Sequence, residues 1–388
     1  MPDKYAIIKE FSKRYGSEPE HLFFCPGRIN IIGEHIDYNG GKVMPCAISM
    51  GTFLAVSKNT AKRIRFQCLN FPEVAELHLQ ESYSKAGNQW FNYPLGVIHE
   101  FIQNNYPISG LDLLYYGNLP IGAGLSSSAS IEVLTAFALS EMFAVDLTKK
   151  EIALLSKKVE NEFIGVNCGI MDQFAVAFGK KNNAILLDCE TLDPEYIPLE
   201  LGDYILAIIN TKKERSLVGS KYNDRFFECG TALKQLKKNL SITTLCDLDL
   251  KSFIRNQSLI QDPVIRKRTE HVISENERVK LAAESFKSGD IVSFGKLMYE
   301  SHRSLKELYE VSCTELNTII DFCKTFAGCI GARMTGAGFG GCAIALIRNE
   351  NFDEFEAKIS NYYTEKIGYN PEVYKTEIGD GVREISMD

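Results

Sequence analysis

A short segment rich in glycine and serine has the composition of an anion-binding loop. It reads Gly122-Ala123-Gly124-Leu125-Ser126-Ser127-Ser128 and follows Asn118-Leu119-Pro120-Ile121. Its two glycines allow positive φ and a close approach of the backbone to a ligand, and its serines can cap a helix. Free N–H groups and the dipole of a helix that begins there favour a negative charge. A phosphate group is therefore the expected ligand.

Two common phosphate-binding loops are excluded by the spacing of these glycines. The sequence contains no G-x-x-x-x-G-K-[ST] motif, and Gly122-x-Gly124 lacks the third glycine of a dinucleotide-binding fingerprint. The three serines leave two interpretations open. They either cap a helix after a flexible turn, or one hydroxyl ligates a magnesium ion that a bound nucleotide carries.

A second polar cluster lies nearer the N-terminus, among apolar runs. Arg28 is followed by Glu34, His35 and Asp37, and the apolar runs are residues 23–32 and 43–53. Carboxylates accept hydrogen bonds from hydroxyl groups, and hydroxyl oxygens accept them from arginine, so the cluster can bind a sugar or another polyol. The alternative is a set of solvated loop charges, with His35 bonded to its own framework. Enclosure between buried strands favours the first interpretation.

Two further carboxylates, Glu160 and Asp172, are ambiguous from their positions alone. Glu160 lies beside the apolar stripe of a predicted helix, where a solvated glutamate is the simpler interpretation. Asp172 follows Gly169 and opens the short apolar segment 174–178, so it is either an N-cap or a catalytic carboxylate. Position alone favours the N-cap.

Hydrophobic periodicity predicts the elements that must position these residues. An apolar run over 111–116 predicts a strand that leads into the serine loop, and a helix pattern starts at Ser130. A helix is predicted over 148–165, with Thr148 and Glu151 as a capping box. The glycine run 336–341 precedes a strand, so we expect it at a hairpin tip, because a dinucleotide fingerprint would open a helix. Other predictions are helices over 4–15 and 352–366, strands over 204–210 and 372–377, and a mainly helical region over 250–326.

The composition describes an ordinary globular protein and excludes several classes. The chain has 388 residues, 45% hydrophobic and 24% charged, which is enough for two domains. Its net charge of −7 argues against a nucleic-acid-binding protein, whose backbone contacts need a basic face. No apolar run approaches the length of a membrane span. The 11 cysteines show no C-x-x-C pair and no zinc spacing, and no signal peptide is visible, so we expect a reducing, cytoplasmic location.

Taken together, the motifs resemble those of the galactokinases, a family of the GHMP sugar and metabolite kinase superfamily, along nearly the whole chain. The segments that carry the resemblance are residues 27–38, 120–129, 168–173 and 334–342. The serine loop and the glycine hairpin recur across the superfamily, whereas the first and third segments narrow it to galactokinases. Three positions depart from the usual pattern: Ile36, Phe226 and Ala337 stand where threonine, arginine and glycine are usual.

The resemblance implies a role for each motif. Asp172 matches the catalytic aspartate that takes the proton of the anomeric C1 hydroxyl, and Arg28 matches the residue that orients it and stabilises the transferring phosphoryl group. Ser128 and Glu160 match the positions that hold Mg²⁺. The matched nucleotide-binding residues are Gly122 to Ser128, and the matched sugar contacts are Glu34, His35, Asp37, Gly169 and Tyr222. These matches replace the simpler interpretations of Glu160 and Asp172.

The resemblance also implies a fold and a reaction. The fold is α+β, with mixed and antiparallel sheets packed against helices in two lobes, residues 1–200 and 201–388, and the active site in the cleft between them. The reaction is ATP-dependent phosphorylation of D-galactose at C1 in galactose catabolism, with ATP and Mg²⁺ as cofactors. The alternatives are an N-acetylgalactosamine kinase and a galactokinase-like regulator that senses sugar; the intact serines and Asp172 favour the enzyme. No nucleic-acid or membrane partner is expected, and a monomer is compatible with the sequence.

Overall fold

The largest sheet of the protein is six-stranded, in a computed structural model that describes residues 4–120, 122–213 and 218–388. The strand order is β13-β1-β3-β6-β4-β5, and every neighbouring pair is antiparallel except β4 and β6. The strands are β1 (His21–Asn30), β3 (Pro45–Asn59), β4 (Arg63–Cys68), β5 (Ala75–His78), β6 (Gly110–Gly117) and β13 (Arg383–Glu384). The strand predicted before the serine loop is β6, so that prediction is confirmed.

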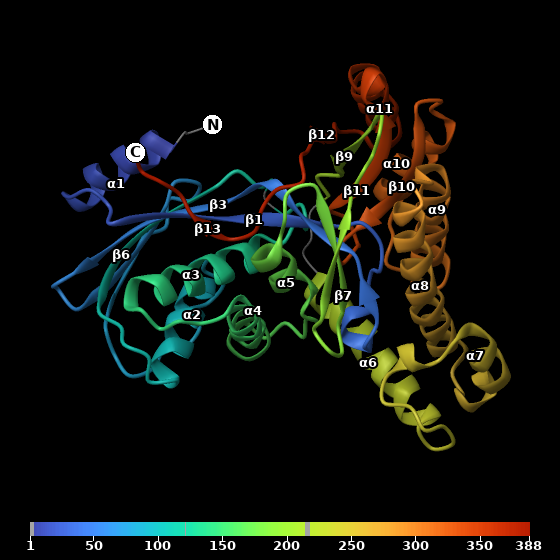
Figure 1. Cartoon of the computed structure of the whole chain (residues 1–388), viewed down its shortest axis with the longest axis horizontal. Helices are drawn as coiled ribbons and strands as arrows, with labels where there is room; N and C mark the ends of the chain where they lie inside the picture. The colour runs from blue at the N-terminus through green and yellow to red at the C-terminus, as the bar shows by residue number, and fades with distance from the viewer. Residues whose placement is uncertain (1–3, 121, 214–217) are drawn as a thin grey trace.

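Helices cover both faces of this sheet (Figure 1). The amphipathic helix α1 (Lys4–Tyr15) packs on one face through Ile7 and Phe11. The other face carries α2 (Asn92–Gln103), α3 (Ser127–Phe143), α4 (Lys149–Lys158) and α5 (Met171–Phe178). The helix predicted over 148–165 is confirmed: the capping box of Thr148 and Glu151 starts α4, and a π-helical turn, η2 (Val159–Ile164), ends it.

A second sheet builds the other half of the molecule. Its order is β10-β11-β9-β12, all antiparallel, and it is covered by a stack of long helices (Figure 1). The strands are β9 (Tyr204–Asn210), β10 (Cys329–Thr335), β11 (Cys342–Arg348) and β12 (Glu372–Lys375). The helices are α6 (Val218–Leu236), α7 (Leu250–Asn256), α8 (Pro263–Lys287), α9 (Ile291–Glu307), α10 (Thr314–Thr325) and α11 (Phe352–Ile367). Because β10 and β11 pair with Thr335 opposite Cys342, the predicted glycine hairpin is confirmed.

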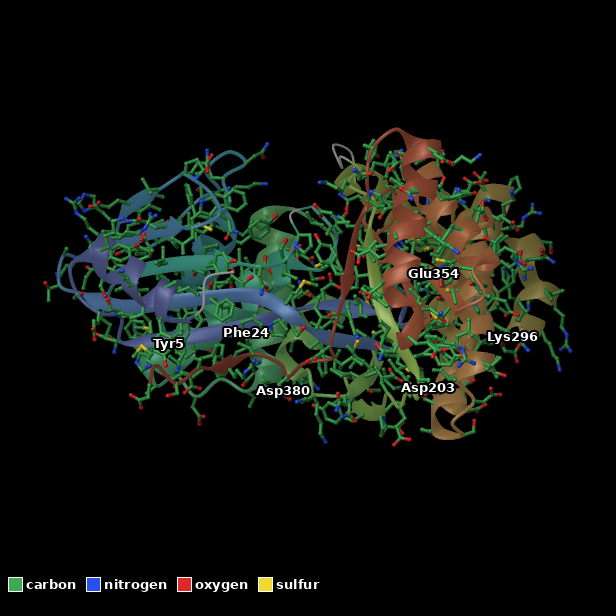
Figure 2. The ribbon with its side chains drawn as sticks, turned by 90° about the horizontal axis from the view of Figure 1, so that it is seen from above. Tyr5, Phe24, Asp203, Lys296, Glu354 and Asp380 are labelled. Carbon is green, nitrogen blue, oxygen red and sulfur yellow. The ribbon has the colours of Figure 1, made fainter. Side chains whose placement is uncertain are left out.

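The end of the chain returns to the first sheet. Strand β13 pairs with β1, with Glu384 opposite Phe23, and Lys4 of α1 donates a hydrogen bond to the carbonyl of Ser386 at 3.0 Å. Figure 2 accordingly shows Tyr5, Phe24 and Asp380 on the side of the first sheet, and Lys296 and Glu354 on the side of the second. The division of the chain into residues 1–200 and 201–388 stays a prediction. Residues 383–384 lie in the predicted second part but pair with a strand of the first sheet.

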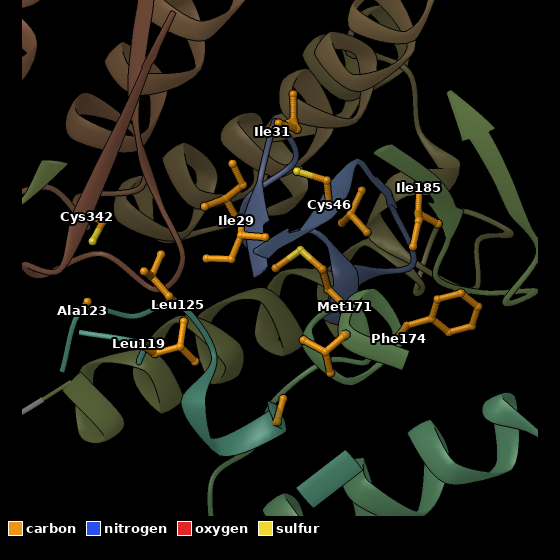
Figure 3. Close-up of a cluster of buried hydrophobic side chains, with 14 of the residues drawn as sticks. Ile29, Ile31, Cys46, Leu119, Ala123, Leu125, Met171, Phe174, Ile185 and Cys342 are labelled. Carbon is orange, nitrogen blue, oxygen red and sulfur yellow. The ribbon is translucent and has the colours of Figure 1, made fainter. Parts of the chain in front are cut away.

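A small third sheet and an apolar core lie where the two halves meet. The third sheet contains β2 (Lys42–Val43), β7 (Asn183–Asp188) and β8 (Pro194–Pro198). The core collects apolar side chains from each polar motif, as Figure 3 shows: Ile29 and Ile31 from the end of β1, Ala123 and Leu125 from the serine loop, and Met171 and Phe174 from α5. Burying these neighbours anchors the motifs and leaves their polar residues to face one another.

None of the helices in the described part of the chain combines the length and the apolar character that crossing a membrane requires.

Candidate active site

The serine loop joins β6 to α3 through a left-handed backbone. Gly122 and Gly124 have φ of 70° and 75°, and Ser126 has φ of 61° immediately before the helix starts at Ser127. Ala123 and Leu125 are buried, which fixes the loop to the core, and Ile121 lies outside the described residues. Ser126 makes no side-chain cap to α3. The capping interpretation is therefore wrong for Ser126, and its hydroxyl is used elsewhere.

That hydroxyl donates a hydrogen bond to Asp172, which also binds Arg28. Ser126 Oγ lies 2.5 Å from Asp172 Oδ2, while Arg28 Nε and Nη2 lie 2.8 and 2.6 Å from the two carboxylate oxygens. Arg28 Nη1 donates to the carbonyl of Gly124 at 2.8 Å. The side chain of Arg28 is 5% exposed and that of Asp172 is 29% exposed, so the carboxylate can reach a ligand.

The interpretation of Asp172 as an N-cap is wrong. Ile170 occupies the N-cap position of α5, without a side-chain cap, and Asp172 lies in the first helical turn. Its carboxylate instead pairs with Arg28 through two parallel charge-assisted hydrogen bonds, which fix its orientation as well as its position.

Glu160 lies in the π-helical turn and is held on both carboxylate oxygens. Ser128 donates to its Oε1 at 3.0 Å, and Gln173 Nε2 donates to its Oε2 at 2.6 Å. The solvated interpretation of Glu160 is therefore wrong. Burial and then the charge of Asp172 raise its pKa to about 7. Among the described residues, no three His, Cys, Asp or Glu side chains surround a common metal position. Ser128 and Glu160 offer one hydroxyl and one carboxylate oxygen donor, which suits an ion that keeps waters and binds phosphate.

A cavity of about 150 Å³ opens beside Asp172 and brings the predicted sugar contacts together. Its lining includes Arg28, Glu34, His35, Asp37, Glu160, Gly169, Asp172 and Tyr222, with Gly336 and Ala337 from the glycine hairpin. The hairpin belongs to the second half of the molecule and the other motifs mainly to the first. Residues from three motif segments that are far apart in the sequence, 27–38, 168–173 and 334–342, therefore line one cavity.

His35 is fixed as a neutral ring. Its backbone has φ of 64°, its Nε2 lies 3.2 Å from the carbonyl of Ala337, and its Nδ1 lies 2.9 Å from the hydroxyl of Tyr38. A carbonyl only accepts, so Nε2 carries the proton and Nδ1 accepts from Tyr38. Burial lowers the pKa of His35 to about 3, which agrees with this state. His35 therefore lines the cavity with its ring while both nitrogens bond the protein.

Asp37 and Gly169 both line the cavity and are in close contact with each other. A side chain at Gly169 would overlap the carboxyl group of Asp37, so only glycine fits here. Burial and then the nearby charge of Asp172 raise the pKa of Asp37 to about 6, since two carboxylates in one apolar site disfavour each other's ionisation.

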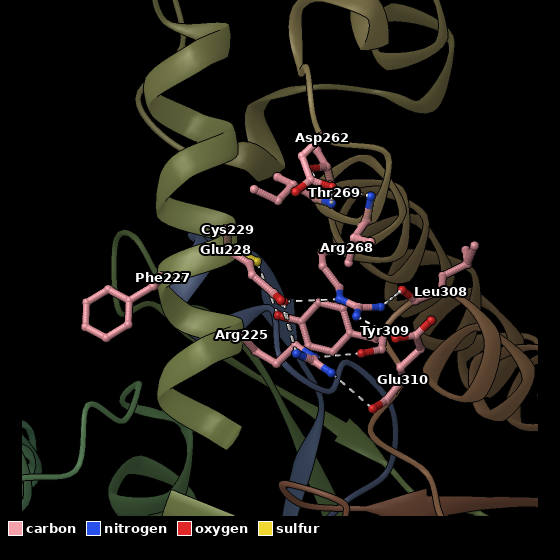
Figure 4. A network of polar contacts seen from close by, with 12 residues as sticks. Arg225, Phe227, Glu228, Cys229, Asp262, Arg268, Thr269, Leu308, Tyr309 and Glu310 are labelled. Atoms are coloured by element: carbon pink, nitrogen blue, oxygen red, sulfur yellow. Dashed lines mark hydrogen bonds and ion pairs between the residues drawn. The ribbon is translucent and has the colours of Figure 1, made fainter. Parts of the chain in front are cut away.

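Tyr222 of α6 lines the cavity. Further along this helix, Arg225 and Glu228 belong to a network of polar contacts that fixes the helix (Figure 4). Arg225, one turn further on, donates to the carbonyl of Tyr309 at 2.8 Å and pairs with Glu228. Arg268 of α8 also pairs with Glu228, at 3.1 Å, and donates to the carbonyl of Leu308 at 2.5 Å. These contacts join α6 and α8 to the turn after α9.

The same turn supports His35 through a row of hydroxyl groups. Tyr309 OH lies 2.8 Å from Tyr38 OH, and the rings of His35 and Tyr222 are 5.4 Å apart. Tyr38 and Tyr309 were not predicted as part of the site. Tyr38 lies within the first motif, but Tyr309 has no sequence signal, since only the fold brings it 271 residues back to Tyr38.

The departures Ile36 and Phe226 do not line the cavity. Ile36 is buried in the core, and the ring of Phe226 packs against that of Tyr38 at 5.6 Å. Ala337 does line it, but bonds His35 through its carbonyl, which any residue supplies.

A second cavity, of about 160 Å³, lies behind the serine loop and was not predicted. Four aromatic residues line it, Phe71, Trp90, Tyr93 and Tyr115, and α3 contributes Ser127, Ser128 and Ile131. A wider groove of about 630 Å³ adjoins it, shares Asn70, Gly117 and Leu119, and carries Lys212 and Lys213 from the second half. The start of α3 thus borders the second cavity through Ser127 and Ser128, while Ser126 bonds Asp172 of the first cavity.

Comparison with known proteins first defines the class. Residues 92–180 match the family model described as GHMP kinases N terminal domain, and residues 282–365 match GHMP kinases C terminal. A mevalonate kinase structure from Methanococcus jannaschii shares the fold, with a TM-score of 0.67, 21% identity, and coverage of 94% of this chain and 100% of that one. The protein thus has the fold of the GHMP kinases.

Further matches identify the family. Residues 9–58 match the galactokinase galactose-binding signature. The galactokinase of Clostridium tetani is 49% identical over 98% of this chain and 97% of its own, and that of Enterococcus faecalis is 47% identical over 98% and 99%. The structure of Lactococcus lactis galactokinase complexed with galactose superimposes with a TM-score of 0.96, at 43% identity, covering 98% of this chain and 99% of that one. The chain belongs to the galactokinase family.

Proposed function

We propose that this protein transfers the γ-phosphoryl group of ATP to the C1 hydroxyl of D-galactose, giving α-D-galactose 1-phosphate and ADP. The position of Asp172 is the main support: it lines the polar cavity and accepts a hydrogen bond from Ser126 of the anion-binding loop. A hydroxyl group bound in the cavity therefore meets a proton acceptor beside the place where phosphate binds.

In this proposal Asp172 and Arg28 act as a pair. Asp172 orients the C1 hydroxyl and receives its proton, while Arg28, bound to both its oxygens, holds the carboxylate in place and adds positive charge near the transferred group. Phosphoryl transfer passes through a loose transition state, so positioning and charge stabilisation supply most of the rate.

The sugar is bound by residues around the cavity. Glu34 and Asp37 accept hydrogen bonds from ring hydroxyls, Tyr222 and the ring of His35 form one wall, and Gly169 leaves the space that Asp37 needs. Glu34 is buried and Asp37 is half-buried, so a hydroxyl group of the wrong configuration leaves a shielded acceptor unpaired.

The nucleotide occupies the other side of the loop. Gly122 to Ser128 bind its phosphates, and its base stacks in the aromatic cavity with Trp90 and Tyr93, which suits a flat ring system. Ser128 and Glu160 would hold Mg²⁺, which when bound neutralises phosphate charge. We place the enzyme in the cytoplasm and expect a monomer; all eleven cysteines are free.

A coupled assay of ADP release tests the proposal. Galactose should release ADP and yield a product whose ³¹P spectrum shows phosphate at C1. 6-Deoxygalactose, which keeps the C1 hydroxyl, should react, and 1-deoxygalactose should not. ADP release with 1-deoxygalactose would contradict transfer to C1. Binding of sugar and ATP without turnover would favour the sensing regulator.

A further inference from the structure

A fully buried cluster of charges lies beneath the sugar cavity. Arg333 of β10 is 0% exposed and lies between Glu34, 2% exposed, and Glu275 of α8, 0% exposed. The described residues that line the cavity do not include Arg333 or Glu275, and neither residue has a role in the proposed reaction. We infer that Arg333 is a positioning residue for sugar binding, which fixes the carboxylate of Glu34 as an oriented acceptor for a galactose hydroxyl. This inference rests on the proposed function.

Arg333 contacts the sugar-binding segment at two points. Its Nη1 donates to the carbonyl of Asn30 at 2.9 Å and lies 3.5 Å from Glu34 Oε1. The same oxygen of Glu34 accepts the N–H of Gly336 at 2.7 Å. Protein donors thus converge on Oε1, and the residue itself lines the cavity. Arg333 therefore joins the end of β1 to the glycine hairpin at the place where Glu34 meets the sugar.

The opposite side of Arg333 is fixed by Glu275. Its Nη2 lies 3.8 Å from Glu275 Oε1, and that oxygen accepts the N–H of Gly33 at 3.0 Å and the hydroxyl of Ser301 at 2.6 Å. Glu275 Oε2 accepts from Arg278 at 2.7 Å. Glu275 therefore holds Gly33 through its N–H, and Arg333 holds the next residue, Glu34, through its carboxylate.

Hydrogen bonding alone does not explain why an arginine stands here. Within the described residues, Arg333 Nε and Nη2 have no hydrogen-bond partner, although both are buried. A buried donor without a partner is unfavourable, so a neutral side chain of similar shape would be preferred if Arg333 only filled space. Its positive charge, shared between two buried carboxylates, is the property that the site uses.

The charge acts on the protonation of Glu34. Burial raises the pKa of Glu34, and Arg333 is the largest opposing influence, ahead of Arg28. A protonated Glu34 would lose acceptor capacity toward a sugar hydroxyl. The titratable and charged groups that face Glu34 are Arg28 of β1, Asp37 of the following loop, His271 and Glu275 of α8, and Arg333 of β10. Burial keeps His271 neutral, with a pKa of about 4, so the arginines supply the positive charge.

Steady-state kinetics of Arg333→Met test the inference, with Arg278→Met as the matched control. Both substitutions remove an arginine that pairs with Glu275, but only Arg333 contacts Glu34. In Arg333→Met we expect the KM for galactose to rise at least tenfold and the KM for ATP to change less than twofold. The pH at which the galactose KM reaches its lowest value should lie higher in Arg333→Met than in the wild type, because Glu34 loses the charge that most favours its ionisation. Arg278→Met should show neither effect.

Two further variants keep the inference testable if Arg333→Met folds poorly. Arg333→Lys retains the charge and should show a smaller rise of the galactose KM with a wild-type pH profile. In a Glu34→Gln background, Arg333→Met should add less than twofold, because the carboxylate on which it acts is gone. Equal changes in the KM for galactose and ATP, additive effects with Glu34→Gln, or the same effect in Arg278→Met would overturn the inference. Absence of galactose-dependent ADP release in the wild type would instead overturn the proposed function.

Discussion

Arg28 binds both carboxylate oxygens of Asp172, at 2.8 and 2.6 Å, across 144 residues of sequence. The arginine comes from β1 and the aspartate from the first turn of α5, so a strand and a helix are joined at the edge of the cavity. A bidentate pair fixes the plane of the carboxylate as well as its position. This pairing makes Asp172 a directed acceptor rather than a surface charge.

Asp172→Asn should lower kcat at least ~10²-fold. An amide cannot accept the proton of the hydroxyl, and a positioned base usually contributes at least this much to the rate. Binding of galactose and ATP, measured by calorimetry, should stay close to that of the wild type. Asp112→Asn is a matched control, since Asp112 makes the same bidentate pair, with Arg65, far from the cavity. We expect it to lower stability and to leave kcat unchanged. Near-wild-type turnover of folded Asp172→Asn would remove the catalytic assignment.

Glu160→Gln should raise the Mg²⁺ concentration needed for half-maximal activity and lower turnover, since an amide is a weaker ligand than a carboxylate for a hard cation. Galactose binding without nucleotide should change little. Glu100→Gln serves as the control, because Glu100 is buried and pairs with Lys158 of the neighbouring helix. An unaltered Mg²⁺ titration of Glu160→Gln would leave the residue with a structural role in holding Ser128 and Gln173.

Local patterns predicted much of the fold and the polar cluster of Arg28, Glu34, His35 and Asp37, whereas Gly169 and Tyr222 were assigned to the site through the resemblance alone. The glycine and serine spacing located the loop after β6, the capping box located the start of α4, and the second glycine run located the β10–β11 hairpin. Each of these signals depends on residues within a few positions of one another, which sequence makes visible. The resemblance added the roles of Asp172 and Glu160, which remain proposals.

Relationships across long stretches of sequence could not be predicted. Position alone made Asp172 an N-cap, because nothing near it reveals that Arg28 lies within hydrogen-bond distance. The aromatic cavity around Trp90, the support of His35 by Tyr309 and the burial of Arg333 arise only when distant elements pack together. An arginine in a strand gives no sign in sequence that it is fully buried.

Gly169→Ala should raise the KM for galactose about tenfold or more while the KM for ATP changes little. The new methyl group would overlap the carboxyl group of Asp37, so either that side chain or the segment before α5 must move. Gly230→Ala is the control, since a methyl group there meets nothing within 4 Å. We expect it to leave both KM values unchanged. A wild-type galactose KM in Gly169→Ala would show that Asp37 does not need its observed position.

Galactose binding should weaken as the pH falls below about 6. The pKa of Asp37 is raised by burial and by Asp172 to about 6, so the carboxylate is ionised above that pH and takes a proton below it. Loss of the acceptor should raise the galactose KM, up to about tenfold for each pH unit below the pKa. In Asp37→Asn the KM should be high and the rise near pH 6 should disappear. A rise of equal size in Asp37→Asn would assign the titration to another group.

The cavity should distinguish galactose from its C4 epimer, glucose. Glu34 is a buried acceptor and Asp37 a half-buried one, and inversion of one hydroxyl leaves at least one of them without its partner. Each unpaired buried group costs ~1–3 kcal/mol, so one or two mispaired contacts lower kcat/KM by on the order of 10- to 10⁴-fold. N-Acetylgalactosamine should also be a poor substrate, because a cavity of about 150 Å³ has little room for an acetamido group. The departures Ile36 and Phe226 do not relieve this limit, since Ile36 is buried in the core and the ring of Phe226 packs against Tyr38.

Values of kcat/KM for the three sugars under one set of conditions test the prediction. Similar values for glucose and galactose would contradict the proposed contacts, and a preference for N-acetylgalactosamine would favour the alternative kinase.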